Sequence, residues 1–221
     1  MSRNFWIVLI VIIVGFGVIF KIESKKNANQ STNTTPSNHV EGLGKDNVTL
    51  LEYGDYQCPY CGEYYPIVKQ VAAQYNTQII FQFRNLPLTQ LHQNAFAGAR
   101  AAEAASLQGK FWQMHDLLYD QNGEYYASND KYNTWINASN PEADFMSYAT
   151  ELGLNVNEFT TDYSSSQVNN TINADVAAFN KTGEQEATPT FFLDGKYVVP
   201  NPTVASFDQL INAAIQTKTK A

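Results

Sequence analysis

Cysteine is nearly absent from this chain of 221 residues, and the two that occur, Cys58 and Cys61, lie three positions apart. A structural disulfide framework needs several cysteines spread along the chain, so this class of protein is excluded. A chain of this length can instead bury one hydrophobic core and carry extra segments at an end. The lack of any further thiol also protects a reactive cysteine pair, because a spare thiol could be trapped by it.

Positive charge is scarce as well. Lys and Arg number 14 against 21 Asp and Glu, which gives a formal net charge of -7 and an isoelectric point of about 4.9. Binding to nucleic acid needs clustered Lys and Arg for phosphate contacts, and no such cluster occurs in the part of the sequence that we expect to fold. Nucleic acid is therefore not an expected partner.

Only one long apolar run occurs, from Phe5 to Phe20, with Arg3 before it and Lys21, Lys25 and Lys26 after it. At a rise of about 1.5 Å per residue, roughly 16 residues span about 24 Å, just under the roughly 30 Å of a bilayer's hydrocarbon core. A cleavable signal peptide would end in small residues, whereas charged residues follow here. We favour a single uncleaved N-terminal membrane helix, within residues 1–26, over a signal peptide.

The charges beside this run do not decide its orientation. More Lys and Arg follow the run than precede it, which does not favour a cytoplasmic N-terminus. We nevertheless expect the folded domain to be extracytoplasmic, in the cell envelope or periplasm, because of its chemistry and because N-terminal signal anchors generally orient in this way. Residues 27–47 are rich in Asn, Ser, Thr and Gly with few apolar residues, and we predict a flexible polar linker there.

The remaining pattern predicts an α/β domain over residues 48–217. The order is strand, helix, strand, several helices, hairpin, helix. Branched and aromatic residues favour strands at 48–53, 78–84, 190–193 and 197–199, with Asp194-Gly195 as the hairpin turn. Helical spacing and end signals predict helices from about 58, at 91–107, 111–119, 141–152, 156–163, 168–181 and 207–215, and a loop at 125–139.

The cysteine pair lies where the first strand passes into the first helix, as Cys58-Pro59-Tyr60-Cys61. Free backbone N–H groups and the helix dipole stabilise a thiolate at a helix N-terminus, and Pro59 is tolerated in the first turn. The thiolate is the reactive form. Cys58 is therefore the expected nucleophile, and Cys61, one turn later and more buried, is expected to resolve the mixed disulfide.

Three other interpretations of the pair are weaker. A zinc site needs about four ligands, and His39, His92 and His115 lack the spacing that would complete one. Haem attachment requires His directly after the second cysteine, where this chain has Gly62. A purely structural disulfide would close a very short loop and stabilise little. We expect no metal and no cofactor other than a redox-active disulfide between the two cysteines.

The segments 51–61 (LEYGDYQCPYC) and 188–192 (TPTFF) resemble the DsbA-like branch of the thioredoxin superfamily, over roughly residues 48–215. The resemblance implies a thioredoxin-like fold in which residues of about 90–183 form an inserted helical subdomain. It also implies a cis peptide before Pro189, with Thr188 and Pro189 beside Cys58. The Thr188 backbone would then bind an extended substrate segment by strand addition.

The resemblance also assigns roles around the pair. Glu52 lies where related proteins carry an acid beneath the active site, and a partly buried carboxylate there could shuttle the proton of Cys61. Asp55 is predicted to be a turn residue. Tyr56 and Tyr60 are expected to form an apolar rim for peptide substrates, and Pro59 and Tyr60 stand where strongly oxidising members of the branch have a dipeptide with histidine. That departure leaves the oxidising strength open.

The leading hypothesis is a thiol–disulfide oxidoreductase that introduces or exchanges disulfides in reduced or misfolded exported proteins. A membrane redox partner would regenerate its disulfide. One alternative is a membrane-tethered reductase, isomerase or redox relay. An alternative from another class is a peptide-binding holdase on the same scaffold, although a pure binder does not need both cysteines.

Overall fold

The structure, a computed structural model, describes residues 35–127 and 135–220. The apolar run at residues 5–20, expected to be a membrane helix, lies outside these ranges. Within them, no helix is both long and apolar enough to cross a bilayer. The described residues fall in one compact unit of the chain.

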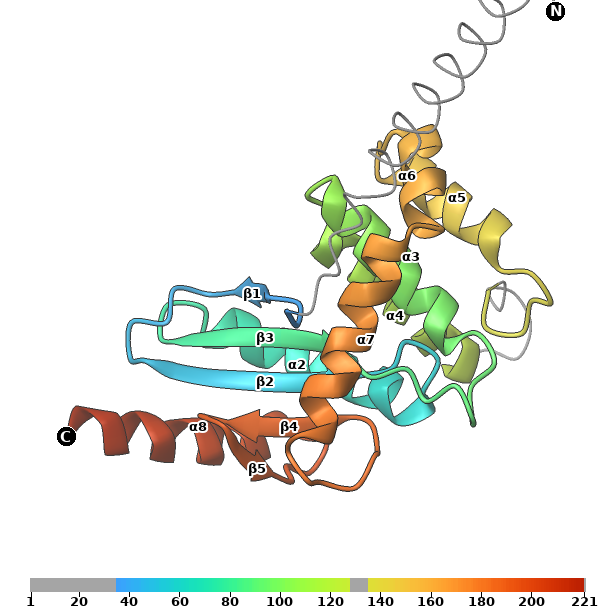
Figure 1. The fold of residues 1–221 in the computed structure, drawn as a ribbon. Helices are drawn as coiled ribbons and strands as arrows, with labels where there is room; N and C mark the ends of the chain where they lie inside the picture. The colour runs from blue at the N-terminus through green and yellow to red at the C-terminus, as the bar shows by residue number, and fades with distance from the viewer. Residues whose placement is uncertain (1–34, 128–134, 221) are drawn as a thin grey trace, which may run out of the picture. The chain divides into compact units, whose positions relative to one another are not determined.

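A five-stranded sheet forms the centre of the fold (Figure 1), in the order β1-β3-β2-β4-β5. Strands β2 (Val48–Gly54) and β3 (Ile79–Asn85) run parallel, in a register that pairs Val48 with Ile79. The edge strand β1 (His39–Glu41) is antiparallel to β3. On the other side, β4 (Thr190–Leu193) is antiparallel to β2, and the hairpin strand β5 (Lys196–Val198) is antiparallel to β4.

Helices cover both faces of the sheet (Figure 1). Successive side chains of a strand point to opposite faces, and the central strands carry apolar side chains on both. On one face, α2 (Pro59–Gln74) and α8 (Val204–Thr219) pack on a core that includes Leu50, Phe81 and Phe191. On the other face, Phe179 of α7 (Ser166–Asn180) packs against Tyr53 and Phe192. Along β2, Val48 and Leu50 therefore face α2 and α8, whereas Leu51 and Tyr53 face α7.

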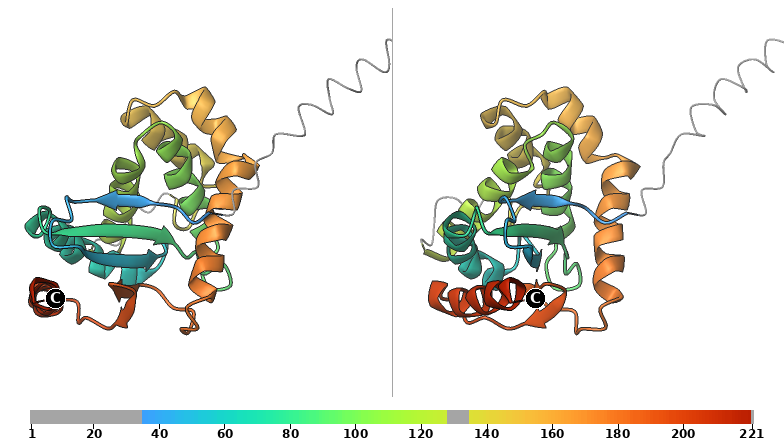
Figure 2. Two further views of the ribbon diagram at one scale, coloured as in Figure 1. Left: turned by 60° about the vertical axis from the view of Figure 1, so that its left-hand side comes forward. Right: turned by 90° about the vertical axis from the view of Figure 1, so that its left-hand side faces the viewer.

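The helical subdomain is inserted between β3 and β4 (Figure 2). Besides α7 it contains α3 (Ala95–Leu107), α4 (Phe111–Ala127), α5 (Glu142–Glu151) and α6 (Val156–Tyr163). Its core is continuous with the cysteine pair, since Cys58 and Cys61 belong to the same buried cluster as Trp135 and Phe145. The expected α/β fold with an inserted helical subdomain is confirmed, and the insertion forms one wall of the site.

The predicted linker over residues 27–47 is wrong for residues 35–47, which belong to the fold. Strand β1 pairs with β3, and Ser37 is buried, donating from its backbone and its hydroxyl to Asp175, at 2.7 Å each. The segment carries little apolar pattern because β1 is three residues long and mostly exposed. It is held by backbone pairing with the open edge of β3, which composition does not reveal.

The other elements lie close to their predicted positions. The helix expected at 91–107 begins later, at Ala95, because residues before it form turns that reach the site. Helix α4 continues to Ala127 instead of ending at 119, so the predicted loop at 125–139 begins too early. Helix α8 is longer than predicted at both ends, and its first turn is capped by the Thr203 hydroxyl, which accepts from Ser206 N–H at 3.3 Å.

Candidate active site

A tight turn after β2 places Cys58 at the start of α2. The Asp55 carboxylate accepts from Gln57 N–H at 2.8 Å, and the Asp55 carbonyl accepts from Cys58 N–H at 3.1 Å. Cys58 is the N-cap residue and Pro59 is the first helical residue, where a missing N–H costs no intrahelical bond. The predicted role of Asp55 as a turn residue is confirmed. The turn therefore places Cys58 at the N-terminal end of the helix.

Cys58 has the character of a reactive thiol. A hydrogen bond from the Cys61 thiol is the largest influence on Cys58 and lowers the pKa of Cys58 to about 6, against the opposing effects of burial and of the Asp55 charge. The Cys58 Sγ also lies 3.4 Å from the Thr188 carbonyl oxygen, to which it donates as a thiol. At neutral pH the reduced protein therefore holds Cys58 largely as thiolate.

Cys61 has the opposite character. Its side chain is fully buried, and burial, followed by its hydrogen bond to Cys58 and the Cys58 charge, raises the pKa of Cys61 well above the ordinary thiol range. Asp55 N–H lies 3.5 Å from the sulfur and acts in the opposite direction, favouring the thiolate. Both cysteines are free thiols in this structure, so the structure describes the reduced pair. The two sulfurs differ in ionisation, as a nucleophile and a resolving thiol must.

The loop before β4 lies against the cysteine pair. The Thr188–Pro189 peptide bond is cis, as the resemblance implied. Thr188 is buried, and its carbonyl contacts the Cys58 sulfur, so residues separated by 130 positions meet at the site. The expectation that Thr188 lies beside Cys58 is confirmed. Its pairing with a substrate segment stays a prediction.

Glu52 lies on β2 beneath the pair and is buried, with 4 % of its surface exposed. Burial raises the pKa of Glu52 to about 8, and the charge of the Cys58 thiolate adds to this effect. At neutral pH the carboxyl is therefore mostly protonated. A neutral buried acid near a cysteine is a ready proton donor.

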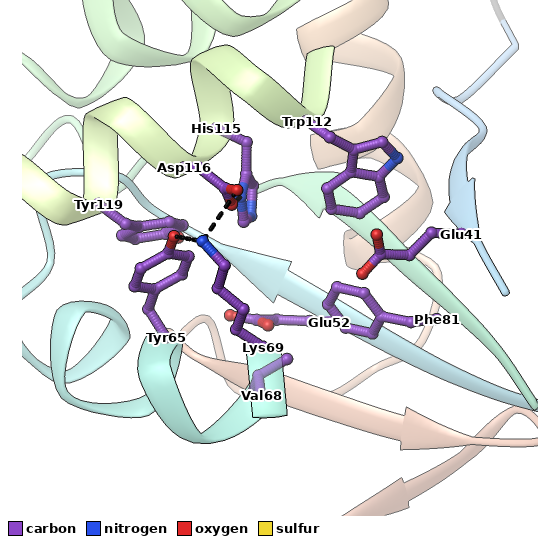
Figure 3. A pocket seen from close by; sticks show the side chains of 10 residues that line it. All are labelled: Glu41, Glu52, Tyr65, Val68, Lys69, Phe81, Trp112, His115, Asp116 and Tyr119. Atoms are coloured by element: carbon purple, nitrogen blue, oxygen red, sulfur yellow. Dashed lines mark hydrogen bonds and ion pairs between the residues drawn. The ribbon is translucent and has the colours of Figure 1, made fainter. Parts of the chain in front are cut away.

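A cavity of about 60 Å³ connects Glu52 with the surface between α2, α4 and the sheet (Figure 3). At its outer side Lys69 Nζ lies 3.0 Å from Asp116 Oδ2 and donates to the Tyr65 hydroxyl at 2.8 Å. Such a volume can hold water, since one molecule needs roughly 10–15 Å³ by this measure. These residues come from α2 and α4, and no sequence motif links the two helices, so their meeting at this cavity could not be predicted.

The two tyrosines of the predicted substrate rim have different surroundings. Tyr60 is 66 % exposed and stands beside the cysteine pair, where a substrate could contact it. Tyr56 is 1 % exposed and packs on Phe83 and Tyr119 in the core, so its assignment to the rim is wrong. The turn after β2 directs Tyr56 inward, toward the helical insertion.

The structure also brings His92 to the site, which the sequence analysis considered only as a metal ligand. His92 Nδ1 lies 2.7 Å from Asp55 Oδ2, and Leu88 N–H donates to the same oxygen at 2.9 Å. Nearby, the Gln57 side-chain oxygen accepts from Asn94 N–H at 2.6 Å. The loop between β3 and α3 is thus bound to the turn that carries Cys58. The sequence indicated only a turn role for Asp55, although its carboxylate also binds the side chain of His92.

Metal-binding side chains do not gather in the part of the chain that the structure describes: no three or more of His, Cys, Asp and Glu are placed there to hold an ion.

Comparison with known proteins supports the same picture. A thioredoxin family model matches residues 34–213. Among curated proteins, a Na(+)/H(+) antiporter NhaA 1 of Salinispora arenicola is 37 % identical over 158 residues, which is 72 % of this chain and 22 % of the antiporter. The chain therefore spans about a fifth of the length of the curated relatives it matches.

Solved structures share the fold. A thioredoxin-like oxidoreductase from Silicibacter pomeroyi has a TM-score of 0.63 and 25 % identity, covering 87 % of this chain and 99 % of the other. Oxidised BdbD from Bacillus subtilis has a TM-score of 0.66 and 19 % identity, covering 82 % and 96 %. Wolbachia pipientis α-DsbA1 has a TM-score of 0.66 and 16 % identity, covering 83 % and 94 %. The chain therefore belongs to the thioredoxin family, and its fold is that of the DsbA-type thiol–disulfide oxidoreductases.

Proposed function

We propose that this protein is a thiol–disulfide oxidoreductase that oxidises thiols of exported proteins through Cys58 and Cys61. The observation that carries the proposal is the asymmetry of the pair. Cys58 has a pKa lowered to about 6, whereas burial holds the pKa of Cys61 well above the thiol range. A stable Cys58 thiolate favours the reduced form of the pair, which makes its disulfide a good electron acceptor.

The reaction begins with the pair as a disulfide. A substrate thiolate attacks the Cys58 sulfur, the Cys58–Cys61 bond breaks, and Cys61 leaves with the electron pair. A second substrate thiolate then attacks the substrate sulfur bound to Cys58, and Cys58 leaves as thiolate. The substrate loses two electrons and gains a disulfide, while the pair gains both electrons.

Cys61 needs a proton when it leaves, because its thiolate is unstable in a buried site. We assign the donor to Glu52, whose raised pKa of about 8 keeps it protonated at neutral pH. The cavity beside Lys69 and Asp116 then lets Glu52 recover a proton from solvent. Tyr60 and the Thr188 backbone are assigned to substrate binding, since both lie beside Cys58 on different elements.

The setting of the reaction is also proposed. We assign the catalytic domain to the extracytoplasmic side of a membrane, held by the apolar run at residues 5–20. A membrane redox partner that withdraws two electrons would return the pair to its disulfide.

The deciding experiment is the reduction potential of the full chain in glutathione buffers. A value near or above about -180 mV, the range of protein disulfide isomerase and DsbA, supports oxidation or isomerisation. A value near about -270 mV, that of thioredoxin, would replace the proposal with a reductase that draws electrons from a membrane donor. Cys58→Ser should abolish exchange with a reduced peptide. Client binding that persists in a Cys58→Ala, Cys61→Ala double variant, without turnover by the unaltered protein, would instead favour a holdase.

A further inference from the structure

Asp55 links the cysteine pair to a histidine from a distant loop. Its backbone contacts both cysteines, accepting from Cys58 N–H at 3.1 Å and donating toward Cys61 Sγ at 3.5 Å. Its carboxylate, whose side chain is wholly buried, lies 2.7 Å from His92 Nδ1. The imidazole is therefore held by the residue that also positions both sulfurs.

The loop around His92 is fixed on both sides, so the ring has a defined place. His92 N–H donates to the Leu88 carbonyl at 2.9 Å, while Leu88 N–H donates to the Asp55 carboxylate at 2.9 Å. Two residues later, Asn94 N–H donates to the Gln57 side chain at 2.6 Å. Every one of these bonds connects the loop to itself or to residues 55–57. A charge on His92 therefore keeps a fixed position relative to Cys58.

The charges around the ring favour its cationic form. The hydrogen bond to Asp55 is the largest influence and raises the pKa of His92. Burial lowers this pKa, whereas the charges of Asp55 and of the Cys58 thiolate raise it further. Asp55 and Cys58 are the charged groups that act on His92 from the turn after β2. Glu186, from the loop before β4, borders a neighbouring pocket with Leu88. The charge of the Asp55 carboxylate raises the pKa of Cys58, and an imidazolium bound to that carboxylate offsets this charge. Since the Cys58 thiolate also acts on His92, an imidazolium at His92 acts on the thiolate in return.

We propose that the Asp55-bound His92 imidazolium stabilises the Cys58 thiolate and thereby raises the reduction potential of the pair. The dipeptide Pro59-Tyr60 contains no cation, and His92 supplies one from outside the helix. His92 forms and breaks no bond in the reaction; it acts through its charge, and Asp55 positions it. The inference rests on the proposed function in that Cys58 is the sulfur that binds substrate and then leaves as thiolate.

The first test needs no substitution. If the thiolate and the imidazolium stabilise each other, removing the thiolate by oxidation must lower the pKa of His92. The pKa of His92 would be measured by NMR of the histidine-labelled full chain, reduced and then oxidised. We expect it to be higher in the reduced protein by about one unit, a tenfold effect on the equilibrium. Equal values in the two states would overturn the inference.

The second test compares His92→Gln with a matched control, His39→Gln. His39 also pairs with a carboxylate, at 2.8 Å from Glu103, and its side chain is similarly buried, but it lies on β1. Thiolate absorbance would be followed against pH in each variant. His92→Gln should raise the pKa of Cys58 by about one unit and lower the potential by about 30 mV, the value of a tenfold change for two electrons. His39→Gln should change neither.

If His92→Gln and His39→Gln give the same Cys58 pKa and potential, His92 has only a structural role. If His92→Gln does not fold, the NMR comparison of the two redox states of the unaltered protein still decides. These measurements are ionisation constants and differences in potential, so they are independent of the client. A low absolute potential would overturn the oxidase proposal. The difference in potential between the unaltered protein and His92→Gln would still show whether His92 stabilises the thiolate.

Discussion

Replacing Glu52 by Gln should stabilise the protein while impairing its redox chemistry. The carboxyl has an ordinary pKa of 4.5 in the unfolded chain and a pKa of about 8 when buried in the fold. The folded protein therefore holds this proton more tightly than the unfolded chain does, and stability falls as the pH rises through this interval. Glutamine has nearly the same shape and carries no charge, so it removes the effect.

The size of the gain follows from the two pKa values. At pH 7, about 2.5 pH units above the unfolded value, the buried carboxyl costs about 3 kcal/mol of unfolding free energy. The gain should vanish below pH 4.5 and reach its plateau above about pH 8. For a chain of this size, about 3 kcal/mol corresponds to roughly 6–12 °C in the melting temperature. Urea denaturation at several pH values, followed by circular dichroism, would measure it.

A matched control is Glu103→Gln, the same change at another buried carboxylate. Glu103 Oε1 accepts from the Asn85 side chain at 2.7 Å and pairs with His39 at 2.8 Å, so its loss should destabilise the fold. The two substitutions should therefore have opposite signs. A Glu52→Gln variant whose stability gain is independent of pH, or absent, would refute the view that Glu52 is buried with an unfavourable charge. With the proton donor gone, that variant should also release Cys61 slowly, measured as slower oxidation of a reduced peptide in single turnover.

Three further outcomes are expected. Cys61→Ser, given a peptide that already contains a disulfide, should accumulate a mixed disulfide that is visible on non-reducing gels. The Cys58 thiolate attacks the peptide disulfide, one peptide thiolate leaves, and the resolving thiol is missing; no trapped species would place the nucleophile elsewhere. Below about pH 6 reduction of the pair takes up two protons, and the reduction potential should fall by about 59 mV per pH unit. Above about pH 6 Cys58 stays a thiolate, only one proton is taken up, and the potential should fall by about 30 mV per pH unit. A constant slope through pH 6 would contradict a lowered Cys58 pKa. Ser37→Ala should lower the unfolding free energy by about 1–3 kcal/mol in urea, since it removes a hydrogen bond to the buried Asp175 carboxylate; an unchanged midpoint would mean that the segment before β1 contributes nothing to stability.

The parts of the fold with strong periodic patterns could be predicted from the sequence. Strand β2 and the cysteine helix were located because branched and aromatic residues end at Gly54 and Pro59 follows the first cysteine. The roles of Cys58 and Cys61 could be predicted from their places at the start of a helix, whereas the largest influence on the Cys58 pKa in the structure is the hydrogen bond from the Cys61 thiol. The cis bond before Pro189 could be expected only from the resemblance, because the residues themselves allow a plain strand start.

The features that could not be predicted depend on contacts between distant segments. Strand β1 has too few apolar residues to signal burial, and its place is set by the open edge of β3. Tyr56 is expected from the sequence to form part of a substrate rim beside the cysteine pair, whereas its side chain packs in the core against Tyr119 of the helical insertion. His92 lies 37 positions from Asp55 in the sequence, and only the folded loop joins them.

The buried carboxylate of Asp175 makes the helical insertion inseparable from the sheet. It accepts hydrogen bonds from Ser37, 138 positions away, and from Asn85 N–H at 3.0 Å, 90 positions away. One side chain of α7 therefore joins the segment before β1, the end of β3 and the insertion. An opening that displaces α7 exposes both amides at once. In hydrogen–deuterium exchange they should therefore exchange together, in the slowest class, as members of one cooperative unit. The helical insertion therefore cannot be transferred to a related protein without the sheet on which it packs. A chimera that lacks the segment before β1 would leave the buried Asp175 carboxylate with fewer hydrogen-bond donors.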